Sequence, residues 1–429
     1  MRQVYRASLF HLLGDPEKDG ADAVQAHDDG VLVVEDGHVA AAGAWDEIGP
    51  TLKGAAIEKL DGILVPGFID CHVHYPQVGM IASPGARLLE WLSNYTFPAE
   101  ARFAHKDVAV TAARFFLDQM LAHGTTSALV FATVHKLSAE TLFEEALARN
   151  MRIISGKVMM DRGAPPNLCD TAETGYMESR SLIRQWHGKG RLGYAVTPRF
   201  ALTSTPDQLE MAGKLVAENP GVHMHTHLSE NPEEVAAVRR AFPDCADYFA
   251  VYEKYGLAGS HSVFAHCLHL SEAEWARFGK SGSTVAFCPT SNLFLGSGLF
   301  DLAAAESTGA CVGLATDVGG GTSLSLLQTM NEAYKVCQLK RRPIDAFKLF
   351  YLATLGAART LRLDGRIGNF APGKEADFVL LDARNAPMLA HRLGGAKSWA
   401  EKLFAYAMLG DDRAVARTWV AGETAYRRA

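Results

Sequence analysis

The amino-acid sequence predicts an α/β fold, a (β/α)8 TIM barrel with a small β-sandwich domain formed by both chain termini. In the middle of the chain, eight short apolar runs alternate with helical patterns, which is the order typical of a parallel barrel. Both ends of the chain instead contain short strand-like segments separated by turn residues. The 429 residues provide enough chain for a large barrel and a smaller unit.

The N-terminal region contains strand-like segments at 4–10, 30–35 and 37–43, separated by turns such as Asp28-Asp29-Gly30. This region has too few apolar residues to close a core of its own. Matching strand-like segments occur near the other end of the chain, at 376–382 and 414–422. We therefore expect residues 1–64 and 370–429 to form the β-sandwich together, and residues 65–369 to form the barrel.

The first predicted barrel strand begins at Phe68, and the others lie at 125–130, 152–159, 192–197, 222–228, 262–267, 284–288 and 312–317. Helical patterns between them cover 107–122, 138–149, 173–187 and 206–219. Thr205 is a plausible N-cap of the last of these helices, because Pro206 follows at the first helical position. Residues 80–106 and 162–172 are longer than typical connections and are candidate active-site loops.

The composition excludes several classes of protein. The formal net charge is -6, which provides no electrostatic footprint for nucleic acid or an anionic membrane. Seven scattered cysteines without a CxxC pair indicate reduced thiols in a cytoplasmic protein. We expect no signal peptide and no membrane span, since no apolar run is long enough. Neither a Walker loop nor a Gly-rich dinucleotide fingerprint is present.

Histidines and an aspartate mark the ends of several predicted strands. Because alternate side chains of a strand share a face, His72 and His74 project the same way. His227 ends the fifth strand, His266 the sixth and Asp317 the eighth. Barrel enzymes keep their chemistry at these carboxyl ends. Three histidines and one carboxylate suit Zn²⁺ with room for a water, or Fe²⁺, and such an ion lowers the pKa of the water toward neutrality.

Some of these residues have a plainer interpretation. His223 and His225 share the strand face of His227, but a tetrahedral site cannot use all of them. His266 is a metal ligand, a contact of the water only, or a buried core histidine. Glu230 follows His227 by three residues and is either a proton carrier in the same pocket or an ordinary acidic residue near a helix start.

The sequence resembles the amidohydrolase superfamily over nearly its whole length. The motifs are Pro66-Gly67-Phe68-Ile69-Asp70-Cys71-His72-Val73-His74, His227-Leu228-Ser229-Glu230, His266, Asp317 and the tail Gly368-Asn369-Phe370-Ala371-Pro372-Gly373-Lys374-Glu375-Ala376-Asp377-Phe378-Val379. The resemblance implies a metal-dependent barrel and a small β-sandwich built from both chain ends. Binuclear members place a carboxylated lysine on the fourth strand, whereas this strand ends Thr197-Pro198-Arg199-Phe200. The resemblance is therefore to the mononuclear-metal deaminase branch.

Within that branch, three stretches resemble deaminases of a purine: His74-Tyr75-Pro76-Gln77, residues 88–100, and Thr197-Pro198-Arg199-Phe200. The implied reaction is hydrolysis of guanine to xanthine and ammonia in a homodimer. One Zn²⁺ per chain, with Fe²⁺ the alternative, is implied to bind His72, His74, His227 and Asp317. The implied substrate contacts are His74, Gln77, Arg199, Phe200, His227, Glu230 and Asp317. The implied catalytic residues are Glu230 as proton shuttle, His266 as hydrogen-bonding partner of the attacking water, and Asp317 as acceptor of its proton.

The residue types agree with a neutral purine as ligand. Gln77 offers both a donor and an acceptor, Arg199 offers a planar fork of donors, and Phe200 offers a ring face for stacking. The alternatives are a related enzyme acting on 8-oxoguanine, an adenosine derivative or a triazine, and a catalytically inactive barrel. A zinc deaminase of the cytidine type is excluded, because the chain has no P-C-x-x-C motif and Cys288-Pro289 has the reverse order.

Overall fold

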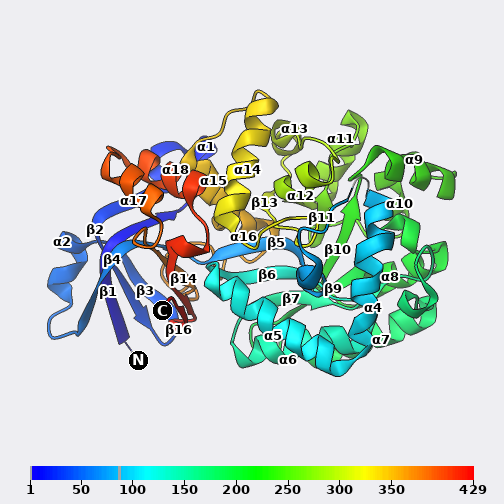
Figure 1. Cartoon of the computed structure of the whole chain (residues 1–429), viewed down its shortest axis with the longest axis horizontal. Coiled ribbons are helices and arrows are strands. Elements are labelled where there is room, and N and C mark those ends of the chain that lie inside the picture. The colour runs from blue at the N-terminus through cyan, green and yellow to red at the C-terminus, as the bar shows by residue number, and fades with distance from the viewer. Residues whose placement is uncertain (1, 86–87) are drawn as a thin grey trace.

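The computed structural model describes residues 2–85 and 88–429, and it confirms the predicted fold class. Eight parallel strands form a barrel, and a separate seven-stranded sheet contains strands from both ends of the chain. Figure 1 shows the two units side by side, with the N- and C-termini both at the terminal sheet. None of the helices in the described ranges is long and apolar enough to cross a membrane.

The barrel strands pair in chain order, each parallel to the next. They are β5 (Phe68–His74), β6 (Thr125–Phe131), β7 (Arg152–Gly156), β9 (Gly193–Pro198), β10 (His223–Leu228), β11 (Ser262–His266), β12 (Thr284–Phe287) and β13 (Val312–Leu314). The backbone N–H of His74 donates to Val318 O at 2.8 Å and that of Asp317 donates to His72 O at 2.9 Å, which joins the eighth strand to the first. The run predicted at 152–159 is divided, because β7 ends at Gly156 and the short β8 (Val158–Met159) pairs with β9.

The four helices predicted between strands are present, with ends within two residues of those expected. They are α5 (Lys106–Ala122), α6 (Lys136–Ala148), α7 (Ala172–Trp186) and α8 (Pro206–Glu218). Thr205 caps α8 as expected, since its hydroxyl accepts a hydrogen bond from the Gln208 N–H at 3.2 Å. The remaining barrel helices are α9 (Pro232–Ala241), α10 (Tyr248–Lys254), α11 (Glu272–Ser281), α12 (Pro289–Phe294), α13 (Leu302–Ser307), α14 (Leu326–Leu339), α15 (Ala346–Ala353) and α16 (Leu355–Thr360).

The terminal sheet has the order β16-β15-β14-β4-β1-β2-β3. Its strands are β1 (Arg2–Leu12), β2 (Val24–Glu35), β3 (His38–Ala44), β4 (Ile57–Pro66), β14 (Phe378–Leu381), β15 (Val415–Val420) and β16 (Glu423–Arg427). One face buries Tyr5 against Phe378 and Trp419, and the last two rings stack with centroids 4.4 Å apart. Because this core needs side chains from both ends, neither end could bury its apolar face alone.

The C-terminal region also contains α17 (Pro387–Gly394) and α18 (Trp399–Leu409), and α18 packs on α14 and α15 of the barrel. Only strands were expected there from the sequence. The N-terminal region contains the short helices α1 (Pro16–Asp19) and α2 (Trp45–Ile48). Gly67 connects β4 to β5. A Cβ atom at this position would overlap the hydroxyl group of Thr126, so glycine is required.

The long connection predicted as a loop at 80–106 is largely helical where it is described, with residues 86–87 lying outside the described residues. It contains α3 (Leu88–Trp91), a π-helical turn η4 (Leu92–Thr96), α4 (Phe97–Ala101) and η5 (Arg102–Ala104). Its apolar side chains pack with Leu168 of the second long connection and with Phe200 at the end of β9. Both long connections therefore lie at the carboxyl end of the barrel.

Candidate active site

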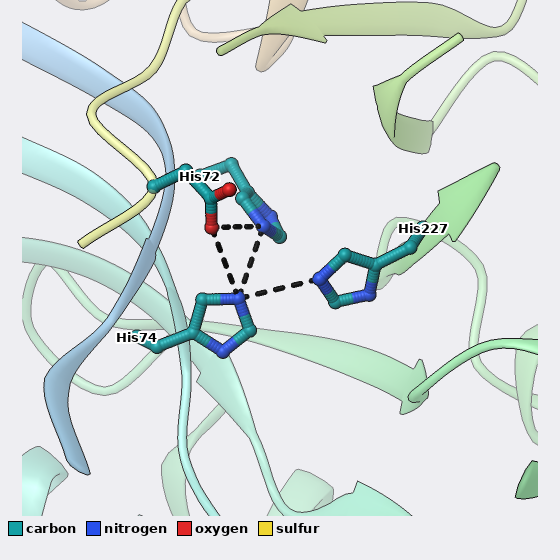
Figure 2. A group of neighbouring side chains, drawn as sticks. His72, His74 and His227 are labelled. Carbon is teal, nitrogen blue, oxygen red and sulfur yellow. Dashed lines mark hydrogen bonds and ion pairs between the residues drawn. The ribbon is translucent and has the colours of Figure 1, made fainter. Parts of the chain in front are cut away.

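The four predicted metal ligands lie together at the carboxyl end of the barrel. The ligand atoms of His72, His74, His227 and Asp317 are all within 4.8 Å of one another. His74 Nε2 lies 3.1 Å from His72 Nε2 and 3.3 Å from His227 Nε2. Asp317 Oδ1 lies 3.1 Å from His72 Nε2 and 3.3 Å from His74 Nε2. Figure 2 shows the three histidine rings pointing toward one another from β5 and β10.

The protonation states of this group suit a cation. The Nδ1 atom of His227 lies 2.7 Å from the carbonyl oxygen of Arg199, and since a carbonyl only accepts, Nδ1 carries the proton and Nε2 a lone pair. Burial lowers the pKa of His227 well below its usual value and that of His74 to about 3, so both rings are neutral. Lone pairs and a carboxylate therefore converge on one point, and this donor set fits a divalent metal ion.

His225 supports the group from β10, two residues before His227. Its Nε2 atom lies 2.7 Å from Nδ1 of His72, and burial lowers its pKa well below the usual value. A neutral His225 can accept the Nδ1 proton of His72, which leaves the Nε2 lone pair of His72 facing the other ligand atoms. His223 is the first residue of β10 and donates from Nε2 to Leu361 O at 2.9 Å. Neither histidine belongs to the group of four.

His266 lies between two carboxyl groups. Its Nε2 atom is 3.4 Å from Glu230 Oε2 and 3.8 Å from Asp317 Oδ2, and its Nδ1 atom is 2.9 Å from Asn292 Oδ1. It is outside the group of four, although His266, Cys288 and Asp317 form a second set of neighbouring potential ligand atoms. Its position next to the group fits a side chain that contacts a water molecule there.

Glu230 and Asp317 are held in opposite protonation states. Burial, followed by the charge of Asp317, raises the pKa of Glu230 to about 8. Burial alone would also raise the pKa of Asp317, but His72, His74 and His266 hold it well below its usual range. At neutral pH Glu230 is therefore a proton donor and Asp317 a proton acceptor, a division typical of acid–base sites.

The backbone is strained where these side chains meet. Ser229, His266 and Asp317 follow or end barrel strands with φ angles of 50°, 74° and 48°. Residues other than glycine rarely adopt this left-handed conformation, and such strain concentrates at functional sites.

A cavity opens beside the group of four. Its lining includes all the residues predicted to contact the substrate: His74, Gln77, Arg199, Phe200, His227, Glu230 and Asp317. His266 also lines the cavity, whereas His72 does not. The structure thus brings all the predicted site residues to one end of the barrel.

Several lining residues were not given a role from the sequence. Leu88, Trp91 and Leu92 cover the cavity from α3 and the following turn, and Leu295 borders it from the end of α12. Glu234 also lines it, and its Oε2 atom accepts from the N–H of Glu230 at 2.9 Å. The sequence contains a local signal for Glu234, since an asparagine N-cap followed three residues later by a glutamate is typical of a capping box, and Asn231 and Glu234 form one at the start of α9.

The comparisons with known proteins agree with this site. A family model described as "Amidohydrolase family" matches residues 63–425. The chain is 48% identical over 419 residues to the guanine deaminase of Escherichia coli (strain K12), covering 96% of this chain and 95% of that one. The solved structure of E. coli guanine deaminase superposes with a TM-score of 0.97 at 47% identity, covering 100% of both chains. Guanine deaminase from C. acetobutylicum, solved with guanine bound in the active site, superposes with a TM-score of 0.90 at 27% identity, covering 99% of this chain and 100% of that chain.

Proposed function

The chain belongs to the amidohydrolase family, and we propose that it is a guanine deaminase, which hydrolyses guanine to xanthine and ammonia. The observation that supports this most directly is the similarity to guanine deaminase over nearly the full length of both chains. The buried cavity agrees with it, because it places donors, an acceptor and an aromatic ring beside a cluster of potential metal ligands.

We propose that His72, His74, His227 and Asp317 hold one metal ion per chain. Three imidazole nitrogens and one carboxylate suit Zn²⁺, and Fe²⁺ is the alternative. When bound, the ion lowers the pKa of a water molecule so that hydroxide is available at neutral pH. His225 and the carbonyl of Arg199 orient two of the ligands from behind through the hydrogen bonds described above.

The proton transfers are assigned to the chain's own carboxyl groups. Asp317, which is ionised, accepts a proton from the attacking water. Glu230, which is protonated at neutral pH, donates to N3 of guanine as water adds at C2. As the adduct collapses, Glu230 takes the proton of the C2 hydroxyl group and carries it to the leaving amine, and the proton held by Asp317 then returns to Glu230. His266 contacts Asn292 through Nδ1, so its Nε2 atom, which lies near Glu230, is available to hydrogen-bond to the attacking water. The sum of these steps is guanine and water giving xanthine and ammonia.

The substrate contacts are proposed from the position of three side chains. Gln77 and Arg199 present polar groups to the cavity, and they can hydrogen-bond to the edge of a purine. Phe200 presents an aromatic ring to the same space, on which a flat base can stack.

We further propose a cytoplasmic homodimer whose β-sandwich comprises residues 1–64 and 370–429 and whose barrel comprises residues 65–369. All seven cysteines are unpaired, which suits a reducing compartment. Light scattering of the purified protein would test the dimer, and a monomer at micromolar concentration would contradict it.

Conversion of guanine by the purified enzyme tests the central proposal. We expect stoichiometric xanthine and ammonia, loss of activity after removal of metal by a chelator, and recovery with Zn²⁺. Parallel assays with 8-oxoguanine, adenosine and an aminated triazine separate guanine from the alternative substrates. Faster turnover of one of these than of guanine would reassign the substrate, and absence of both bound metal and turnover would indicate an inactive barrel.

A further inference from the structure

Glu100 is a buried carboxylate that contacts both polar side chains proposed to bind the purine edge. It is located in α4, with 0% of its surface exposed, and Gln77 and Arg199 are each 2% exposed. Glu100 Oε1 accepts from Gln77 Nε2 at 2.9 Å, and both Glu100 oxygens lie 2.9 Å from Arg199 Nη1. Glu100 is absent from the lining of the cavity, whereas Gln77 and Arg199 belong to it.

These contacts determine which way the amide of Gln77 faces. A carboxylate only accepts hydrogen bonds, so the amide nitrogen must face Glu100. On the other side of the amide, the backbone N–H of Gly319 donates to Gln77 Oε1 at 3.2 Å, and an N–H only donates. Rotating the amide by half a turn would place oxygen against the carboxylate and nitrogen against the N–H, and both hydrogen bonds would be lost.

The same carboxylate holds Arg199 through a single nitrogen. Both Glu100 oxygens bind Nη1, and no hydrogen bond from Nε or Nη2 of Arg199 joins another of the described residues. The guanidinium also lies over the ring of Phe97, with its carbon 5.8 Å from the ring centroid. Two donor nitrogens of Arg199 therefore remain for a ligand in the cavity.

We propose that Glu100 is a positioning residue that makes the site selective for purines with a carbonyl group at C6. The proposal rests on the proposed function and substrate contacts. Arg199 has only donors, so it suits a carbonyl oxygen and opposes an amino group at the same position. Glu100 keeps Arg199 in place and prevents Gln77 from reversing its amide. In a reversed amide the oxygen would take the present place of the nitrogen, where it could accept a hydrogen bond from an amino group.

The substitution Glu100→Gln tests this proposal, because an amide can both donate and accept and therefore permits either orientation of Gln77. The two substrates are guanine and 2,6-diaminopurine, which has the same reactive 2-amino group but an amino group at C6. For guanine we expect kcat/KM to fall about 100-fold, and for 2,6-diaminopurine to change less than about 3-fold. The ratio of kcat/KM for guanine to kcat/KM for 2,6-diaminopurine then decreases at least about 30-fold.

A second readout does not depend on chemistry at C2. Hypoxanthine and adenine lack the 2-amino group and differ at C6, so their competitive inhibition constants report binding alone. The ratio of these constants should narrow in the variant in the same direction as the ratio of kcat/KM. This measurement decides the question if turnover of 2,6-diaminopurine by the unmodified enzyme is too slow to quantify.

The controls separate positioning from folding. Glu90→Gln changes an exposed glutamate on α3 and should leave both ratios unchanged. Glu100→Asp retains the charge beside Arg199 but withdraws the carboxylate by one methylene, so it replaces Glu100→Gln if that variant does not fold. Equal losses with both substrates, or unchanged inhibitor ratios, would overturn the proposal. Failure of the unmodified enzyme to convert guanine would instead overturn the proposed function.

Discussion

His72 and His225 are joined by a contact of 2.7 Å between Nδ1 of the first and Nε2 of the second, inside the barrel. The proposed ligand on β5 is thus held by a residue on β10, in a pair separated by 153 positions in the chain. Side chains behind metal ligands fix the tautomer and the orientation of the ring.

We expect His225→Leu to weaken metal binding about 10- to 100-fold, because His72 loses the acceptor for its Nδ1 proton. Chelator competition followed by metal analysis measures the effect. His225→Gln, whose side-chain oxygen can accept, should retain more affinity than His225→Leu. His223→Gln on the same strand is the matched control, since His223 bonds to Leu361 O and not to the group of four. Equal affinity in all four proteins would contradict the prediction.

Glu230→Gln should reduce kcat for guanine about 1,000-fold, because an amide cannot donate and then regain a proton during the reaction. The metal content should stay unchanged, since Glu230 is not among the four clustered ligands. Steady-state kinetics and metal analysis of the same preparation measure both quantities. Glu210→Gln, an exposed position on α8, provides the control. Near-normal turnover by the Glu230 variant would refute the shuttle role.

Glu375→Gln should lower the free energy of unfolding by about 3 kcal/mol, because it removes the negative charge that faces two buried arginines. Glu375 lies before β14 and accepts from Arg152 and Arg191 at 2.9 Å each. Arg191 also pairs with Asp377, so the cluster links the terminal sheet to the barrel. Urea unfolding measures the change, with the exposed Glu423→Gln as control. A loss equal to that of the control would show that the cluster adds no stability.

Stability should depend on pH through His223. Burial lowers the pKa of its imidazole from 6.5 to about 4, so the unfolded chain takes up a proton below pH 6.5 that the folded chain does not. His223 therefore lowers the free energy of unfolding as the pH falls from 6.5 toward 4. Between pH 7 and pH 5 it lowers this free energy by about 2 kcal/mol. His223→Gln should unfold with a correspondingly smaller pH dependence in urea titrations, and an unchanged pH dependence would exclude His223 as a cause.

Much of the fold was predictable because strands and helices leave periodic patterns. The pair His72 and His74 was informative for the same reason, since alternation along a strand places both side chains on one face. The alternation alone could not separate His223, His225 and His227, which share a face of β10. Only the depth of each along the barrel distinguishes them, and depth depends on where the neighbouring strands end.

The role of Glu100 could not be inferred from sequence patterns. It lies 23 positions from Gln77 and 99 from Arg199, and no periodicity reports contacts between a covering helix and the ends of distant strands. The helical form of residues 88–104 was also missed, because its turns are short and include a π-helical turn. Similarly, α17 and α18 lie within a region whose strand-like segments dominated the prediction.

Strand β4 pairs with β1 on one side, in parallel, and with β14 on the other, antiparallel. During synthesis the second side stays unpaired until nearly the whole polypeptide has left the ribosome, since β14 begins at Phe378. An open strand edge is a site for association with other nascent chains. We therefore expect chains that terminate before β14 to aggregate. Their first contacts should form through the open edge of β4, the strand that precedes β5 and its His72.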